Sequence, residues 1–175
     1  MTPSDSFLVA ARLSLVMVIA LTFQLAIAPR VELFGVHGDL MLLIAIAAGM
    51  AAGPQRGATI GFVVGLIYDL GLSTPLGLSA LTFALMAYAV GHLQPLVIRA
   101  AWWIPVVTAA AASAIGVIVY GVFDTMVGQD LVSLSLLKVA LVVAFWNAIA
   151  APIVVPVMRW ATAPAEGLRV RSVYR

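Results

Sequence analysis

Long runs of apolar residues dominate the chain and set its secondary structure. Residues 13–25 and 104–122 form such runs, and neither shows the apolar/polar alternation of a membrane-barrel strand. Backbone groups in a lipid bilayer need hydrogen-bond partners within the protein, so runs of this kind form helices. The pattern therefore predicts an all-α membrane protein.

Polar and proline-containing breaks divide the apolar sequence into six expected spans. We expect them at residues 7–28, 40–52, 57–72, 75–98, 102–124 and 134–158. The second and third are only about 20 and 24 Å long, against a hydrocarbon core of about 30 Å. They either cross a thinned region or form a re-entrant hairpin. We favour two short crossings, and hence a bundle of six transmembrane helices.

The composition agrees with a bilayer environment. Of the 175 residues, 64% are hydrophobic and 9% are charged, and the mean hydropathy is +1.16. A water-soluble domain of this length could not bury so much apolar surface. We expect residues 1–163 to form one polytopic membrane domain and residues 164–175 a basic cytoplasmic tail.

Several kinds of chemistry find no support in the composition. The chain has no cysteine, which excludes a disulfide framework, a thiol nucleophile and a thiolate metal site. His37 and His92 stand apart, without the spacing of a metal site. We expect no metal, no cofactor and no enzymatic activity. Nucleic acid is not an expected partner either, because the basic residues are spread over helix ends and the tail.

Lysine and arginine are distributed unequally between the two sides of the expected bundle. Arg30 and Lys138 fall on one side. The other side carries Arg12, Arg56, Arg99, Arg159, Arg169, Arg171 and Arg175. The positive-inside rule places the richer side, and both termini, in the cytoplasm.

A stripe of glycines marks the third span. Gly57, Gly61 and Gly65 recur every four residues, so they lie on roughly one face of a helix. Glycines at this spacing let membrane helices approach closely. The stripe serves either internal packing, which we favour, or docking of a partner's transmembrane helix.

Asp69 continues the glycine series at the outer end of the same span. The helix dipole disfavours a negative charge there. We expect it to accept hydrogen bonds from backbone N–H groups near Gly77, as a structural tie across the turn that holds Thr74 and Pro75. Thr74 is expected to cap the fourth helix and Pro75 to be its first residue. The alternative for Asp69 is a proton or ion site.

Three further polar residues have simple structural interpretations. Asp39 immediately precedes the second span and is expected to be its N-cap. Gln24 and Asn147 are lone amides within helices, and such amides most often bond a neighbouring helix. A contact of either amide with a substrate is the alternative.

Residues 38–91 together resemble the rod shape-determining protein MreD family. The resemblance rests on the strings Asp39-Leu-Met-Leu-Leu, Gly57-x-x-x-Gly61-Phe62-x-x-Gly65-Leu66-x-x-Asp69, Pro75-Leu76-Gly77-Leu78-Ser79-Ala80-Leu81 and Ala87-Tyr88-x-x-Gly91. Two positions depart from the family pattern: Gly38, where proline is expected, and Ala87, where glycine is common. Elsewhere the chain matches only in topology.

The resemblance implies a non-enzymatic scaffold of the bacterial cell-elongation complex, which makes peptidoglycan and sets rod shape. It implies a multi-pass protein of the inner (cytoplasmic) membrane that binds MreC through transmembrane helices. The MreB filament, the RodA polymerase and its penicillin-binding transpeptidase are further implied partners.

The family is also similar in architecture to the six-helix substrate-binding subunits of energy-coupling-factor vitamin transporters. Such a subunit is the alternative function. A vitamin site would need several polar side chains facing outward, and the outer loops offer few. They are Glu32, His37, Asp39, Ser73, Thr74, Asp124, Gln129 and Asp130.

Overall fold

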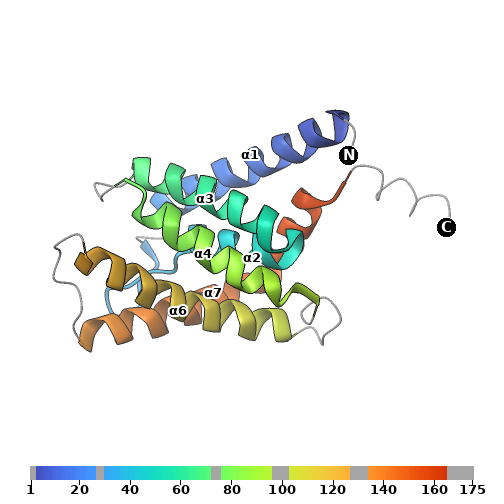
Figure 1. Ribbon diagram of the computed structural model, residues 1–175. Helices are drawn as coiled ribbons and strands as arrows, with labels where there is room; N and C mark the ends of the chain where they lie inside the picture. The colour runs from blue at the N-terminus through green and yellow to red at the C-terminus, as the bar shows by residue number, and fades with distance from the viewer. Residues whose placement is uncertain (1–2, 27–29, 72–75, 96–102, 127–133, 165–175) are drawn as a thin grey trace.

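The computed structural model describes residues 3–26, 30–71, 76–95, 103–126 and 134–164. The named elements in these ranges are all helices (Figure 1). They are α1 (Pro3–Ala26), α2 (Leu40–Ala52), α3 (Pro54–Gly71), α4 (Leu78–His92), α6 (Ile104–Met126) and α7 (Leu134–Thr162). Thr74, Pro75 and nearly all of the expected tail lie outside the described residues.

The second helix, α2, forms the core of the bundle. Every residue from Met41 to Met50 is buried, and α2 contacts α1, α3, α4, α6 and α7. A helix that is apolar on all sides is stable only where other elements surround it. Asp39 caps its start, and Gly53, with φ of 81°, ends it after 13 residues.

The other helices pack around α2 in two pairs. After the turn at Gly53, α3 runs back along α2 and packs extensively on α4, while α6 pairs with α7. The first helix, α1, lies at the edge of the bundle and packs mainly on α7 and α2 (Figure 1). The start of α1 and the end of α7 lie at the same end of the molecule.

Two helix starts differ from those expected. The third helix begins at Pro54 rather than Gly57, because proline fits the first helical position, where its missing N–H is not needed. The fourth begins at Leu78, so the expected start at Pro75 with Thr74 as cap is wrong. Its N-cap is Gly77, whose φ of 99° strongly favours glycine.

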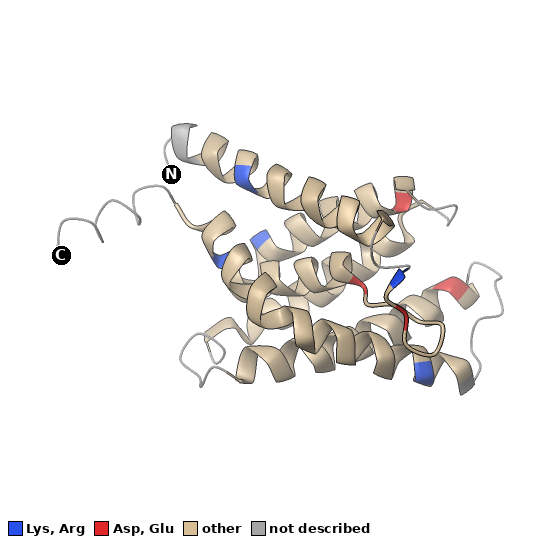
Figure 2. Cartoon of the chain, turned by 180° about the vertical axis from the view of Figure 1, so that it is seen from behind, with Lys and Arg blue, Asp and Glu red and all other residues tan. Residues whose placement is uncertain are grey.

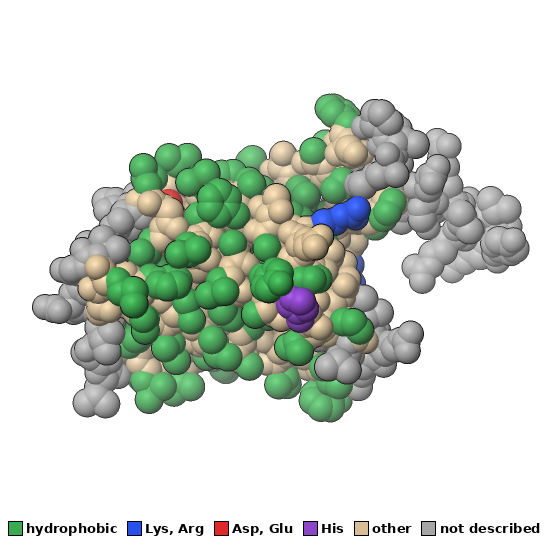
Figure 3. Space-filling view, viewed as in Figure 1, with side chains coloured by type: hydrophobic (Ala, Val, Ile, Leu, Met, Phe, Trp, Pro, Cys, Tyr) green, Lys and Arg blue, Asp and Glu red, His purple; other side chains and the backbone are tan. Residues whose placement is uncertain are grey.

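Three helices of the described chain are long and apolar enough to cross a membrane. They are Ser6–Ala26, Ile104–Met126 and Ser135–Thr162. The apolar helices α2 and α4 are shorter, and α2 is enclosed by its neighbours. Large apolar side chains cover the outside of the bundle (Figure 3), as expected of a surface in contact with lipid.

Charged side chains gather toward the two ends of the bundle (Figure 2). Arg12, Arg56 and Arg159 lie toward the end where α1 begins and α7 ends. The Arg12 guanidinium donates a hydrogen bond to the backbone oxygen of Ala163, at 3.4 Å. The acidic side chains that Figure 2 colours lie toward the opposite end.

The glycine stripe of α3 faces α2 and α4 inside the bundle. A Cβ atom built on Gly57 would lie 2.6 Å from the Cα of Gly49 in α2. One on Gly65 would lie 2.5 Å from the Cα of Ala80 in α4, and Gly61 has a similar contact with α4. These distances are too short for a side chain, so the stripe lets three backbones meet.

Bulk added to the stripe should therefore destabilise the protein. We expect Gly65→Ala to cost about 1–3 kcal/mol and Gly61→Leu to cost more, because the nearest atoms are backbone and cannot move aside. Thermal unfolding in mild detergent measures the effect. Gly71→Ala in the same helix is the control, since its nearest atom lies 4.0 Å from the added Cβ. Equal unfolding midpoints for Gly65→Ala and Gly71→Ala would contradict the packing described.

Candidate functional site

Most of the polar side chains buried in the bundle lie close to the start of α2 or to the start of α4, whichever helix they belong to. The buried polar residues of the described chain are Gln24, Asp69, Ser79, Thr82, Ser113, Asp124 and Asn147. Two of them, Gln24 and Asp69, accept hydrogen bonds from backbone N–H groups that a neighbouring helix leaves without partners at its start.

The start of α2 is held from two sides. Asp39 accepts a hydrogen bond from the Leu42 N–H at 2.9 Å, which satisfies one free donor of the first turn. Gln24 of α1 bonds the segment on either side of Asp39. Its Nε2 donates to the Gly38 oxygen at 3.1 Å, and its Oε1 accepts from the Leu40 N–H at 2.9 Å.

Asn147 of α7 completes the attachment of α2. Its Nδ2 donates to the backbone oxygen of Asp39 at 3.0 Å and to Ser113 Oγ of α6 at 2.9 Å. Next to it, a Cβ on Gly38 would lie 2.8 Å from the Cβ of Trp146. The glycine at this position, where the family pattern suggests proline, therefore makes room for Trp146.

Asp69 holds the start of α4 in the same way, by hydrogen bonds to its first backbone groups. It is 1% exposed, and its carboxylate accepts three backbone hydrogen bonds from the turn and first residues of α4. The donors are the N–H groups of Gly77 at 2.8 Å, Ser79 at 3.2 Å and Ala80 at 3.3 Å. The free N–H groups at the start of α4 are thus capped by a side chain of α3.

The attachment of α2 also fixes its depth. Asn147 and Ser113 lie 13 residues from the ends of α7 and α6 on the acidic side, which corresponds to about 20 Å of helix. The start of α2 therefore lies well below those ends. Between the start of α2 and the acidic ends of α6 and α7 lies a cavity of about 380 Å³, flanked by the two helix pairs.

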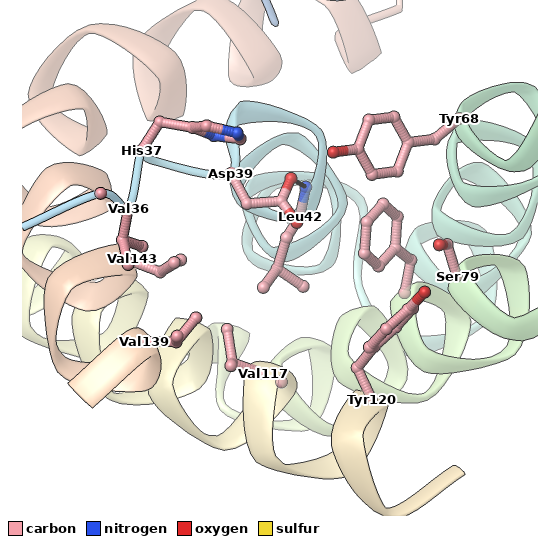
Figure 4. A pocket seen from close by; sticks show the side chains of 13 residues that line it. Val36, His37, Asp39, Leu42, Tyr68, Ser79, Val117, Tyr120, Val139 and Val143 are labelled. Atoms are coloured by element: carbon pink, nitrogen blue, oxygen red, sulfur yellow. Dashed lines mark hydrogen bonds between the residues drawn. The ribbon is translucent and has the colours of Figure 1, made fainter. Parts of the chain in front are cut away.

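The cavity is lined by apolar and aromatic side chains with a few oxygen atoms (Figure 4). Its walls come from α2, α3, α4, α6, α7 and the loop before α2. Sequence patterns singled out His37 and Asp39 from this set but missed Tyr68, Ser79 and Tyr120. The only signals for them were that Tyr68 precedes Asp69 and that Ser79 belongs to the Pro-Leu-Gly-Leu-Ser string.

A second cavity, of about 430 Å³, separates α1 from α2 and α7. Only apolar residues line it: Val16, Ile19, Ala20, Phe23, Leu40, Ile44, Ala150, Ile153, Val154 and Val157. Within the described ranges, no three His, Asp or Glu side chains gather closely enough to hold a metal ion.

Substitutions of Asp69 should follow its role as a cap. Asp69→Leu would leave three backbone donors unpaired, at about 1–3 kcal/mol for each buried donor. Asp69→Asn keeps one acceptor oxygen and should lower the thermal unfolding midpoint less. Folded variants that lose cell-shape complementation equally would contradict this role and indicate a proton or ion site.

The comparisons with known proteins address the whole bundle. Searches of curated proteins and of solved structures found no match to the chain. The family described as rod shape-determining protein MreD matches residues 5–161, from α1 to the last turn of α7. That span far exceeds the motif region of α2 to α4 and includes the polar attachments described above. The chain belongs to the rod shape-determining protein MreD family.

Proposed function

We propose that this protein acts in rod shape determination as a non-enzymatic scaffold that binds the transmembrane helix of MreC. In this proposal it crosses the bacterial cytoplasmic membrane six times, with both termini inside the cell. MreB, RodA and the penicillin-binding transpeptidase are further partners of the same assembly. Membership of the MreD family carries the role in cell shape, and the surface of the bundle supports the rest.

The separation of charges supports the orientation. Arg56 lies in the first turn of α3, toward the same end as the start of α1 and the end of α7. A turn at that end is what two successive crossings by α2 and α3 produce. The basic end then faces the cytoplasm under the positive-inside rule.

The apolar cavity of about 430 Å³ between α1 and α7, which we call the groove, is the docking surface that we propose for MreC. The glycine stripe is already covered by α2 and α4, whereas α1 packs on the rest of the bundle over a small area. The groove is wholly apolar. Its rim includes Ile19 and Ile153, which are 60% and 71% exposed. A single apolar helix could fill this space by van der Waals packing.

Cysteine labelling tests the topology. The chain contains no cysteine, so Gln55→Cys in the first turn of α3 and Glu32→Cys in the loop before α2 each give one reactive site. In intact cells a membrane-impermeant thiol reagent should label Glu32→Cys but reach Gln55→Cys only after permeabilisation. Labelling of Gln55→Cys from outside would refute the two crossings.

Cross-linking tests the docking groove. We expect Ile153→Cys to cross-link to single cysteines placed along the transmembrane helix of MreC, with a helical periodicity. Leu81→Cys on α4, which is 53% exposed, is the matched control and should give no cross-link. Cross-links from Leu81→Cys and none from Ile153→Cys would place MreC elsewhere.

A pair of polar substitutions gives an independent measure. Ile153→Gln and Leu81→Gln both place an amide on the lipid-facing surface, and only Ile153→Gln should reduce co-purification of MreC. Gly61→Leu should lower stability and MreC binding together, because its stripe is internal. A stable, monodisperse Gly61→Leu protein that no longer binds MreC would instead assign the docking surface to the stripe.

A further inference from the structure

The cavity next to the start of α2 contains a buried polar group that the packing of the bundle leaves without a partner. Ser79 is 1% exposed, yet its hydroxyl has no hydrogen-bond partner. Its backbone N–H is used by Asp69, while its side chain lines the cavity. Figure 4 shows the Ser79 oxygen directed into this space. A buried hydroxyl without a partner is costly unless something binds it.

A carboxylate lies on the other side of the same cavity. Asp39 uses one oxygen, Oδ1, to cap α2, and Figure 4 shows its carboxylate beside Leu42, directed into the cavity. In the described residues no lysine or arginine pairs with it. The neighbouring His37 turns its Nδ1 toward the Gly38 oxygen, at 3.1 Å. The second oxygen of Asp39 takes no part in the bond to Leu42, and the carboxylate lines the cavity.

Aromatic rings complete the wall. Tyr68 and Phe83 stack with their ring centroids 5.9 Å apart, and Tyr120 of α6 lines the cavity with them. The Tyr68 hydroxyl points toward the Asp39 side (Figure 4). Aromatic faces attract cations, and a carboxylate adds direct charge compensation. The remaining walls are aliphatic, from residues such as Val117 and Val139.

We propose that this cavity binds a primary amine in its ammonium form, with an apolar body. The ammonium group lies against Asp39 and the aromatic rings, Ser79 supplies a further oxygen, and the apolar body fills the aliphatic side. A volume of about 380 Å³ lies within the range of small-molecule sites. The amine belongs either to a free small molecule or to the ethanolamine headgroup of a lipid. The site is separate from the proposed MreC groove.

Three probes of one shape test the charge requirement. The full chain in mild detergent is titrated with 2-phenylethylamine, 2-phenylethanol and phenylacetate, which differ in the charge of one group. Binding is measured by calorimetry and by the shift of the thermal unfolding midpoint. Only the amine should bind and raise the midpoint. Equal binding of the three probes would overturn the proposal. So would a protein that binds neither 2-phenylethylamine nor a lipid with an amine headgroup.

Variants locate the binding to the cavity. Asp39→Asn removes the charge and keeps the N-cap, since asparagine caps helices as well as aspartate does. It should weaken amine binding about tenfold or more. Asp124→Asn is the control, a buried carboxylate that does not line the cavity, and it should leave binding unchanged. Val139→Phe should block the cavity, and a normal unfolding midpoint without ligand shows that it is folded.

Bilayers of two compositions distinguish the sources of the amine. The protein is placed in nanodiscs of phosphatidylethanolamine with phosphatidylglycerol, or of phosphatidylglycerol alone. Native mass spectrometry then reports retained phosphatidylethanolamine. Retention that requires Asp39 and is displaced by 2-phenylethylamine assigns the site to the lipid headgroup. Equal binding of 2-phenylethylamine in both bilayers assigns it to a free amine. Amine binding that Asp39→Asn leaves intact in every arm would exclude the site.

Discussion

A helix at the centre of a membrane bundle must have its polar ends satisfied inside the protein. The second helix has only 13 residues, and all of its middle is enclosed by other helices. Its first N–H groups lie inside the bundle and have no partner within the helix, and lipid offers no hydrogen bonds. Gln24 of α1 and the N-cap Asp39 accept hydrogen bonds from N–H groups of its first turn, and Asn147 of α7 donates one to the Asp39 backbone oxygen. In the described residues, the buried amides Gln24 and Asn147 thus both attach the start of α2.

The same solution recurs at α4, where a carboxylate from α3 replaces a local cap. Such distant caps work only if the helices are held at fixed depth and close together. The glycines of α3 provide that closeness, because their contacts are to backbone atoms of α2 and α4. Glycine packing and polar capping are thus two parts of one arrangement, and a side chain added at Gly65 disturbs both.

Local sequence patterns were sufficient for some features and not for others. Helix spacing placed Gly57, Gly61 and Gly65 on one face, and the break after Ala52 ended α2 at the expected residue. The predicted start of α4 was wrong because Thr74 and Pro75 form a strong local signal in the sequence. The N–H groups at the actual start are capped by Asp69, a residue of another helix. The contact of Asn147 with the Asp39 backbone depends on how deep α2 lies between α6 and α7, which no local pattern encodes. The cavity follows from that depth and was missed for the same reason.

The start of α2 separates the two spaces to which we assign ligands. Leu40 and Ile44 face the apolar groove beside α1, while Asp39 and Leu42 face the cavity with the aromatic wall. Gln24 joins the two sides, because it belongs to α1 and bonds the backbone on both sides of Asp39. A helix seated in the groove and an amine in the cavity would contact opposite faces of the same turn. If binding of the helix shifts this turn and changes the affinity for the amine, binding of the amine changes the affinity for the helix by the same factor, since coupling free energies are reciprocal.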